Sequence, residues 1–589
     1  MFQVNYRKRK NTELFKSLES SDSLFLVESQ NYIPIYTKFF ALNNTNFNNI
    51  NLNNLWQVNS VNKKINDNQN LYSSTIKNID NNSIIDKNIF FKLAPLLDPY
   101  KYLIGKYNDQ NESIFKLPKI DITETNIIKK FLDVNNSAYV DGFFVFLTSK
   151  LLHEHNFING IDYYGSFLSI KNNFVINVFD DIDYLNCSDY FNKNKNKLFF
   201  IEDYAHLFKE QEPKLTPISI QHNISSNSKL SLQSLDENIF EDIFEIENNK
   251  INDETNELVD IKNLDITFND NQNVTIKSNT TCSSRTSYTS TSEDDMDDID
   301  DMDDIDDMDD IDDSDNEELE TGEENSENLE DDILNVTIPK FPVQVICMEN
   351  CEKTFDELII KNDLKHDQWF ASLMQVIMIL ITYQKVFNFT HNDLHTNNIM
   401  YIPTEKKYLY YCYKKKYYKV PTFGRIFKII DFGRSIYKFN GNIFCSDSFQ
   451  NGGDAATQYN TEPYFNDKKP RLEPNFSFDL CRLACSIYDY IIDETDDIKN
   501  INKIKDPIKR LILEWCLDDK GINILYKNNG DDRYPDFKLY KMIARCVHNH
   551  TPQAQLDRPE FKKFLNFKGE LPSKNDIIDI DKMPIYIYN

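Results

Sequence analysis

Two short segments carry side chains suited to one kind of chemistry. The first, at 391–398, reads His-Asn-Asp-Leu-His-Thr-Asn-Asn, and the second, at 431–433, reads Asp-Phe-Gly. Transfer of a phosphoryl group needs a carboxylate that takes the proton of the attacking hydroxyl, and oxygen ligands that hold magnesium on the phosphates. Asp393 suits the first task. The amide oxygen of Asn398 and the carboxylate of Asp431 suit the second.

Apolar segments next to both motifs are expected to hold them in place. A long helix is predicted over 367–387, just before the first motif, because apolar side chains recur at helical spacing there. A strand over 399–402 should follow that motif, and a strand over 426–430 should lead into the second. Gly433 is expected to let the chain turn sharply behind Asp431.

The two motifs resemble the H-R-D-L-x-x-x-N and D-F-G motifs of the eukaryotic protein kinase superfamily. The surrounding sequence is most similar to the serine/threonine kinases of mimivirus-type giant DNA viruses, over residues 81–185 and 337–570. The resemblance implies an α+β, bilobal protein-kinase-like fold with a small β-rich N-lobe and a helical C-lobe. It also implies transfer of the γ-phosphoryl group of ATP, with Mg²⁺, to Ser or Thr hydroxyls of proteins.

The same resemblance implies how the nucleotide would be held. Lys92, in a strand predicted over 89–97, matches the lysine that pairs with the nucleotide phosphates; the alternative is an edge-strand lysine that faces solvent. Glu349 and Cys351, in Met-Glu-Asn-Cys at 348–351, match the hinge whose backbone hydrogen-bonds adenine. The alternative there is an ordinary strand end.

Two further residues match positions that support the catalytic loop. Asp479, at the start of a predicted helix, resembles the buried Asp that holds the loop backbone; the alternative is an N-cap. Arg558, in Asp-Arg-Pro, resembles the arginine that forms an ion pair beneath the segment after Asp431, with Glu462 or Glu473 as its partner. A surface Arg is the alternative for this position.

The N-terminal part departs from the family pattern. No glycine occurs before Gly105, so the phosphate-covering loop must be Asn-rich, and we place it at 81–87. The helix predicted over 137–155, capped by Ser137 or Asn136, should supply an acidic partner for Lys92. Thr148 stands near the expected place, with Asp141 before it and Glu154 after it, and Asp141 is our choice.

The catalytic loop departs from the pattern at two positions. Asn392 replaces the usual Arg that receives a phosphorylated residue, which suggests activity without that switch. His395 replaces the usual Lys; its imidazole either meets a phosphate oxygen or packs within the loop. The same His occurs in small-molecule kinases of the aminoglycoside and choline type.

Three functions therefore remain open. The first is a protein kinase, favoured by the long segment between Asp431 and Asp479 and by the late Asp-Arg-Pro. The second is a kinase-like small-molecule phosphotransferase. The third is a catalytically weak pseudokinase that acts as a scaffold through its acidic insertion; the missing glycine loop favours it, and the intact Asp393, Asn398 and Asp431 oppose it.

The chain divides into regions by composition. We expect an N-terminal extension of uncertain structure at 1–80, the N-lobe at 81–185 with a strand pair over 163–170 and 173–179, and an insertion at 186–336. Residues 337–352 should form the last N-lobe strand and the hinge, 353–570 the C-lobe, and 571–589 a tail. The stretch 293–332 holds 25 acidic residues and no Lys or Arg, which predicts a disordered segment able to bind a basic partner.

Composition limits the remaining partners. The acidic stretch accounts for most of the formal net charge of −29, so bulk charge says little about binding. Lys and Tyr are mixed over 406–418, where a hairpin with alternating faces is more expected than a nucleic-acid site. The ten cysteines predict buried free thiols and not zinc. With no signal peptide in Met1–Lys10 and no long apolar run, we expect a soluble intracellular protein, in the host cytoplasm or the virion if viral, with no membrane partner.

Overall fold

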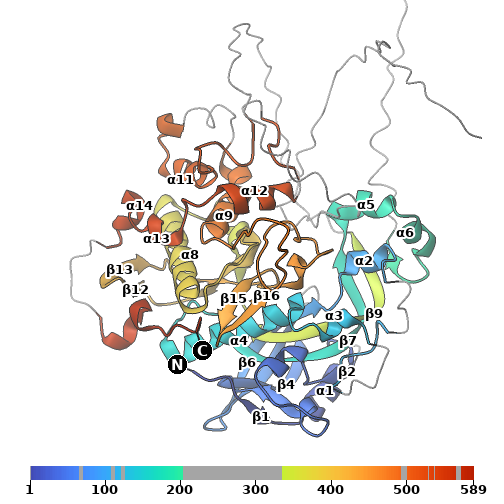
Figure 1. The fold of residues 1–589 in the computed structure, drawn as a ribbon. Coiled ribbons are helices and arrows are strands. Elements are labelled where there is room, and N and C mark those ends of the chain that lie inside the picture. Colours follow the sequence, from blue (N-terminus) through green and yellow to red (C-terminus); the bar gives the residue numbers. More distant parts are fainter. Residues whose placement is uncertain are drawn as a thin grey trace, which may run out of the picture. The chain divides into compact units, whose positions relative to one another are not determined.

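The computed structural model describes residues 2–20, 22–65, 70–107, 113–120, 127–202, 204, 334–492, 501–527, 530–535, 537–565 and 572–588. These residues form a mixed α+β fold (Figure 1). The acidic stretch at 293–332 and most of the predicted insertion lie outside the described residues.

An antiparallel sheet of seven strands dominates the N-terminal half. Its order is β2-β7-β9-β6-β5-β4, and β8 pairs with the far end of β9. The two central strands, β6 and β9, carry the predicted Lys92 and hinge segments, and both strands are rich in apolar residues that the sheet buries. The strands are β2 (Leu26–Gln30), β4 (Trp56–Lys64), β5 (Leu71–Asn78), β6 (Ile84–Pro95), β7 (Tyr163–Asn177), β8 (Phe200–Ile201) and β9 (Asn335–Glu349).

Helix α4 (Ser137–His155) packs against β7 and β9 of this sheet. The side chain of Asn136, one of the two predicted caps, accepts a hydrogen bond from the backbone of Ala138. Asn156 ends the helix in the left-handed region (φ 55°), so the predicted bounds 137–155 are confirmed. The approach to the sheet is close at Gly142, where an added Cβ would lie 2.1 Å from the Gln344 amide on β9. Glycine at this position therefore lets the helix lie against the strand.

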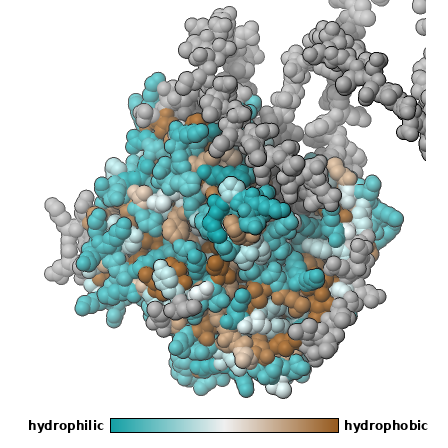
Figure 2. Space-filling view, in the orientation of Figure 1, coloured by the Kyte–Doolittle hydropathy of each residue, from teal (hydrophilic) through white to brown (hydrophobic). Residues whose placement is uncertain are grey.

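The C-terminal half is mainly helical. The predicted long helix is α8 (His366–Phe387), and its apolar stretch has the length and composition of a membrane span, but 94% of it is buried inside the protein. Such burial is usual for the core helix of a globular protein, and Figure 2 shows a mainly hydrophilic surface over α13 and α14. The helices around it are α7 (Phe355–Ile360), α9 (Phe478–Ile491), α11 (Pro507–Trp515), α12 (Lys538–Cys546), α13 (Pro552–Gln555) and α14 (Pro559–Lys562).

Three small sheets complete this half. Strands β10 (Lys353–Thr354), β11 (Ile399–Pro403) and β14 (Arg425–Ile429) form one, and β15 (Ile436–Phe439) pairs with β16 (Asn442–Cys445). The Lys- and Tyr-rich stretch forms the predicted hairpin, β12 (Tyr408–Tyr413) and β13 (Lys416–Pro421). Its turn residues Lys414 and Lys415 both have positive φ, as tight hairpin turns require.

Residues 1–80, whose structure the sequence left uncertain, belong to the same fold. The β4–β5 hairpin extends the sheet beside β6. The backbone of Phe2 donates to the hydroxyl of Tyr586 at 2.6 Å, so the two ends of the chain meet, as Figure 1 also shows. Before the hairpin come β1 (Tyr6–Lys8), α1 (Thr12–Leu18) and β3 (Ile50–Leu52).

Two further expectations need correction. The strand pair predicted over 163–179 is one strand, β7, which pairs with β9 along its whole length; Asn173 takes a positive φ and interrupts the pattern without ending the strand. The polar region from 186 to 202 is also partly regular. The remaining short elements are α2 (Pro99–Leu103), α3 (Lys129–Leu132), α5 (Ile182–Asn186), α6 (Asp189–Asn194) and β17 (Ile577–Asp579), which pairs with β12.

Candidate active site

The two motifs lie side by side. The backbone N–H of Ile430 donates to the carbonyl of Asn398 at 3.0 Å, and the Nε2 of His391 lies 2.9 Å from the carbonyl of Ile430. These contacts follow from the pairing of β11 with β14, since the first motif runs directly into β11 and the second follows β14. The sheet therefore places Asn398 next to Asp431.

Asp479 anchors the 391–398 loop. Its buried carboxylate accepts hydrogen bonds from the backbone N–H of His391, at 2.9 Å, and of Asn392, also at 2.9 Å. Asp479 lies inside α9 and Ser477 occupies the N-cap position, so the N-cap alternative does not apply. A charge-assisted anchor of this kind fixes the loop backbone before any ligand binds.

Asn392 ties this loop to the segment after Asp431. Its φ is 63°, in the left-handed region that Asn tolerates. The Nδ2 of Asn392 donates to the carbonyl of Arg434 at 3.1 Å, and Oδ1 accepts from the hydroxyl of Tyr459 at 2.8 Å. Hydrogen bonds between uncharged groups therefore join the two segments, at the position where the kinases that the sequence resembles have an Arg.

Asp393 is buried and its carboxylate is held on two sides. The hydroxyl of Tyr540, on α12, donates to Oδ1 at 2.8 Å, and Nη1 of Arg434 lies 3.9 Å from Oδ2. Burial would raise the pKa of this carboxyl, but the positive charge of Arg434 and the hydrogen bond from Tyr540 outweigh burial and lower the pKa to about 2. Asp393 is therefore ionised throughout the physiological range.

The amide of Asn398 is oriented by the same loop. Its Nδ2 donates to the carbonyl of Asp393 at 2.9 Å and lies 3.1 Å from Nε2 of His395. Burial lowers the pKa of His395 to about 4, so the ring is neutral at pH 7 and its Nε2 accepts from the amide. Of the two interpretations, the contacts fit a histidine that packs within the loop, and they leave Oδ1 of Asn398 as the amide atom available to a metal.

Lys92 joins the sheet to the second motif. Its Nζ lies 2.6 Å from Asp141 on α4 and 2.8 Å from Asp431. Burial alone would lower the pKa of Lys92, but the two carboxylates outweigh burial and raise it. Because β6 lies between β5 and β9, the edge-strand alternative is wrong. The partner of Lys92 on the helix is Asp141, as predicted, and not Thr148 or Glu154.

Asp431 itself makes the turn that was assigned to Gly433. The φ of Asp431 is 61°, whereas Gly433 is outside the positive-φ region and a Cβ there would meet only Oδ1 of Asp431 at 3.5 Å. The expectation for Gly433 was wrong, because the residue with the strained backbone is the acid. The backbone N–H of Phe432 donates to Asp141 at 2.9 Å and holds this conformation.

The donor set suits magnesium. Asp431 offers a carboxylate whose side chain is 49% exposed, and Asn398 offers an amide oxygen. Carboxylate and amide oxygens are hard ligands of the kind that Mg²⁺ takes, together with phosphate oxygens and water. Asp431 and Asn398 would therefore hold the ion between the two motifs.

Glu349 and Cys351, the two residues assigned to the hinge, differ in their surroundings. The side chain of Glu349 forms a buried ion pair with Lys428 of β14 and accepts from the backbone of Asp162 at 2.8 Å. Its own N–H is used in the sheet, since it donates to the carbonyl of Asp162. Cys351 is buried and follows the end of β9. The Glu349 side chain thus fixes the strand end and does not face a ligand.

Two assignments are corrected by the contacts. Residues 84–87 are paired with β5 as strand, so the segment 81–87 is not a phosphate-covering loop. Residues 66–69, in the β4–β5 connection, lie outside the described residues. Arg558 forms ion pairs with Glu514 and Glu560, whereas Glu462 and Glu473 both pair with Arg471.

Two residues that contact Asp393, Arg434 and Tyr540, were not predicted from the sequence, nor was Asp454, which contacts Arg434. Arg434 follows the second motif directly, and its position was a usable signal. Nothing in the sequence indicated Tyr540 or Asp454, since they come from segments distant from Asp393 in the chain. Asp454 pairs with Nη2 of Arg434 at 2.6 Å.

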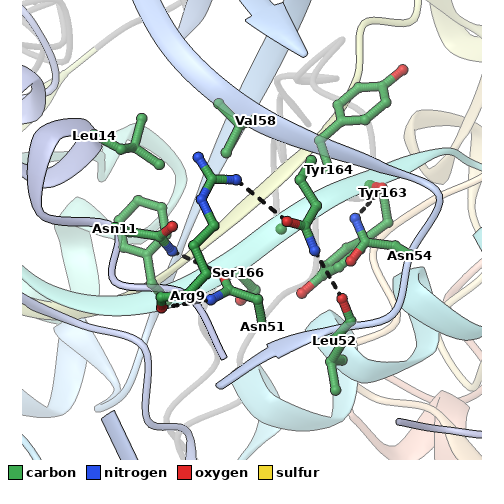
Figure 3. Close-up of a pocket in the computed structure, with 13 residues that line it drawn as sticks. Arg9, Asn11, Leu14, Asn51, Leu52, Asn54, Val58, Tyr163, Tyr164 and Ser166 are labelled. Carbon is green, nitrogen blue, oxygen red and sulfur yellow. Dashed lines mark hydrogen bonds between the residues drawn. The ribbon is translucent and has the colours of Figure 1, made fainter. Parts of the chain in front are cut away.

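A small cavity and one cluster of polar side chains lie outside this site. The cavity in Figure 3, lined by Arg9, Asn51, Asn54 and neighbours, has about 10 Å³ of free volume, room for roughly one water. Cys412, Asp579 and Asp581 lie close enough together to ligate a metal. Asp581 already accepts from the backbone of the hairpin turn. The nine described cysteines are free and mostly buried, as predicted.

Comparison with known proteins adds little evidence about function. No protein-family model matches the chain. A curated relative, uncharacterized protein 098R of invertebrate iridescent virus 6, is 26% identical over 201 residues, which are 33% of this chain and 29% of the relative. The match thus spans less than a third of that protein's length. By sequence, the chain is similar in part to a viral protein whose name states no activity.

Proposed function

We propose that this chain is an ATP-dependent protein kinase that transfers the γ-phosphoryl group to Ser or Thr hydroxyls. The observation that carries the proposal is the convergence of Lys92, Asp431 and the 391–398 loop, which come from three distant parts of the sequence. Phosphoryl transfer depends mostly on positioning and charge neutralisation, and these side chains are of the types that supply both.

The topology supports a bilobal arrangement. The central strand β6 presents Lys92, helix α4 behind it presents Asp141, and β9 runs directly into the segment 350–352 that leads to the C-terminal helices. A nucleotide between the sheet and the β11–β14 motifs would place its phosphates at Lys92. Its adenine would then lie toward the end of β9 at Cys351.

Each polar group then has a task. Lys92 binds phosphate oxygens, and Asp141 holds its ammonium in place. Asp393 orients the acceptor hydroxyl and receives its proton, while Asp479 keeps the loop fixed. Magnesium, held by Asn398 and Asp431, would neutralise phosphate charge. The segment after Asp431 is joined to the loop by Asn392, which supports activity without a phosphorylation switch.

The direct test is transfer from γ-labelled ATP by the full chain, with Mg²⁺, to a mixture of Ser- and Thr-containing peptides and, in parallel, to small alcohols and sugars. We expect labelled Ser or Thr in the peptides, and a higher melting temperature of the chain with magnesium-ATP than without it. Labelling of small alcohols alone would assign the site to small-molecule phosphotransfer. A chain that does not respond to magnesium-ATP in either assay would refute the proposal.

A further inference from the structure

Phosphoryl transfer needs a positive charge on the acceptor side of the site, and the usual source is missing here. His395, which stands two residues after Asp393, has its Nε2 directed at the Asn398 amide, 3.1 Å away, within the loop. Lys92 is already assigned to the nucleotide phosphates, and Asp141 and Asp431 hold its ammonium. A different cation has to face the transferring group, provided that the proposed function holds.

Arg434 is placed for that task. Its Nη1 lies 3.9 Å from Oδ2 of Asp393, the atom on the side opposite the Tyr540 hydrogen bond. Nη1 is buried and has no hydrogen-bond partner among the residues that the structure describes, and the side chain as a whole is only 10% exposed. A buried donor without a partner is costly and points to an acceptor supplied by a ligand.

The rest of the guanidinium is held rigidly. Oδ2 of Asp454 lies 2.6 Å from Nη2. The ring centres of Phe537 and Tyr540 lie 5.9 and 5.7 Å from the guanidinium carbon. Tyr540 is fixed in turn by Nε of Arg482, which donates to its hydroxyl at 2.9 Å. With one edge anchored and its position set by two rings, the group is preorganised to offer Nη1 beside Asp393.

We propose that Nη1 of Arg434 donates a hydrogen bond to a non-bridging oxygen of the phosphoryl group during its transfer. In that step the acceptor oxygen forms a bond to the γ-phosphorus. The bond from the γ-phosphorus to the β,γ-bridging oxygen breaks, and its electron pair stays on ADP. The acceptor proton passes to Asp393. Arg434 stabilises the charge on the oxygens of the group between donor and acceptor, which makes it a catalytic residue.

Arg434→Gln tests this assignment because it keeps much of the side chain and removes the charge. We expect kcat to fall about 100- to 1,000-fold, with the KM for ATP within about threefold, since the interaction belongs to the transfer step. Arg434→Lys should recover only part of the loss, because its single nitrogen cannot lie beside both Asp454 and Asp393 as the two ends of the guanidinium do. The matched control is Arg425→Gln, an arginine of β14 that stacks on Tyr401 and should leave kcat unchanged.

A second readout does not depend on turnover. Mg²⁺, ADP and aluminium fluoride together mimic the group in transfer, and the wild-type chain should be stabilised more by this mixture than by Mg-ADP alone. Arg434→Gln should lose that difference and keep the response to Mg-ADP. In Arg434→Ala, millimolar guanidinium should restore part of the rate.

The outcomes separate the two proposals. A wild-type kcat in Arg434→Gln, or an undiminished response to aluminium fluoride, would overturn the role of Arg434 and leave the kinase proposal standing. A wild-type chain that binds no magnesium-ATP would overturn both.

Discussion

Replacing Asp393 by Asn is expected to lower the rate of phosphoryl transfer about 1,000-fold and to leave magnesium-ATP affinity within about threefold. The amide keeps the size of the carboxylate, and its oxygen can still accept from Tyr540, but it cannot receive the proton of an acceptor hydroxyl. Asp393 makes its contacts with Tyr540 and Arg434 and not with Lys92, so nucleotide binding should persist. The measurement is label transfer from γ-labelled ATP alongside nucleotide binding.

The control for this change is Asp489→Asn, which alters an acid that accepts from Tyr526 at 2.7 Å and takes no part in the site. It should transfer label at the wild-type rate. If Asp393→Asn and the wild type incorporate phosphate equally, Asp393 has no catalytic role.

Replacing Asp431 by Asn should remove the advantage that magnesium gives to ATP binding. The change keeps the shape of the side chain but removes the charge that would hold the ion, and Lys92 remains paired with Asp141. At an ATP concentration about 100 times the wild-type Kd, the wild type should gain about 2.7 kcal/mol in unfolding free energy, and a variant that binds about 100-fold more weakly should gain only about 0.4 kcal/mol.

Denaturant unfolding with ATP, in Mg²⁺ and again in EDTA, measures these gains. In EDTA the two chains should respond alike, because no metal is present for residue 431 to hold. Asp489→Asn again provides the matched control. An Asp431→Asn chain that is stabilised by magnesium-ATP as strongly as the wild type would show that the metal binds elsewhere.

The elements with strong periodicity could be predicted from the sequence. Helices α4 and α8 were found within one residue of their bounds, because their apolar positions recur at helical spacing and Asn residues end both. The two motifs and Asp479 were recognised from residue type and order. Asp141 could be chosen only weakly, since a helix position fixes which face a side chain takes but not the register of the helix against Lys92.

The N-terminal region could not be predicted because its strands are defined by their partners. β4 and β5 contain Asn, Lys and Ser at many positions, and they become strands through pairing with each other and with β6. Segment 81–87 was predicted to be a loop for this reason. Recognition of the hairpin at 56–78 would have shown that 84–87 continue as strand beside β5.

Hydrogen bonds and ion pairs between residues far apart in the chain could also not be predicted from the sequence. Nothing in the segment at 538–546 indicates that Tyr540 is a hydrogen-bond partner of Asp393. Nothing in the sequence indicates that Arg558 pairs with Glu514. Such pairs depend on how distant helices meet. The positive φ of Asp431 could not be predicted either. Glycine is the residue that usually adopts this conformation, so the turn was assigned to Gly433.

The most direct test of the central claim is a crystal structure of the chain with Mg²⁺ and a non-hydrolysable ATP analogue. The account predicts phosphate oxygens at hydrogen-bonding distance from Nζ of Lys92, and a metal bound at about 2.1 Å by oxygens of Asp431 and Asn398. A nucleotide bound away from Lys92, or a metal that touches neither Asp431 nor Asn398, would contradict it.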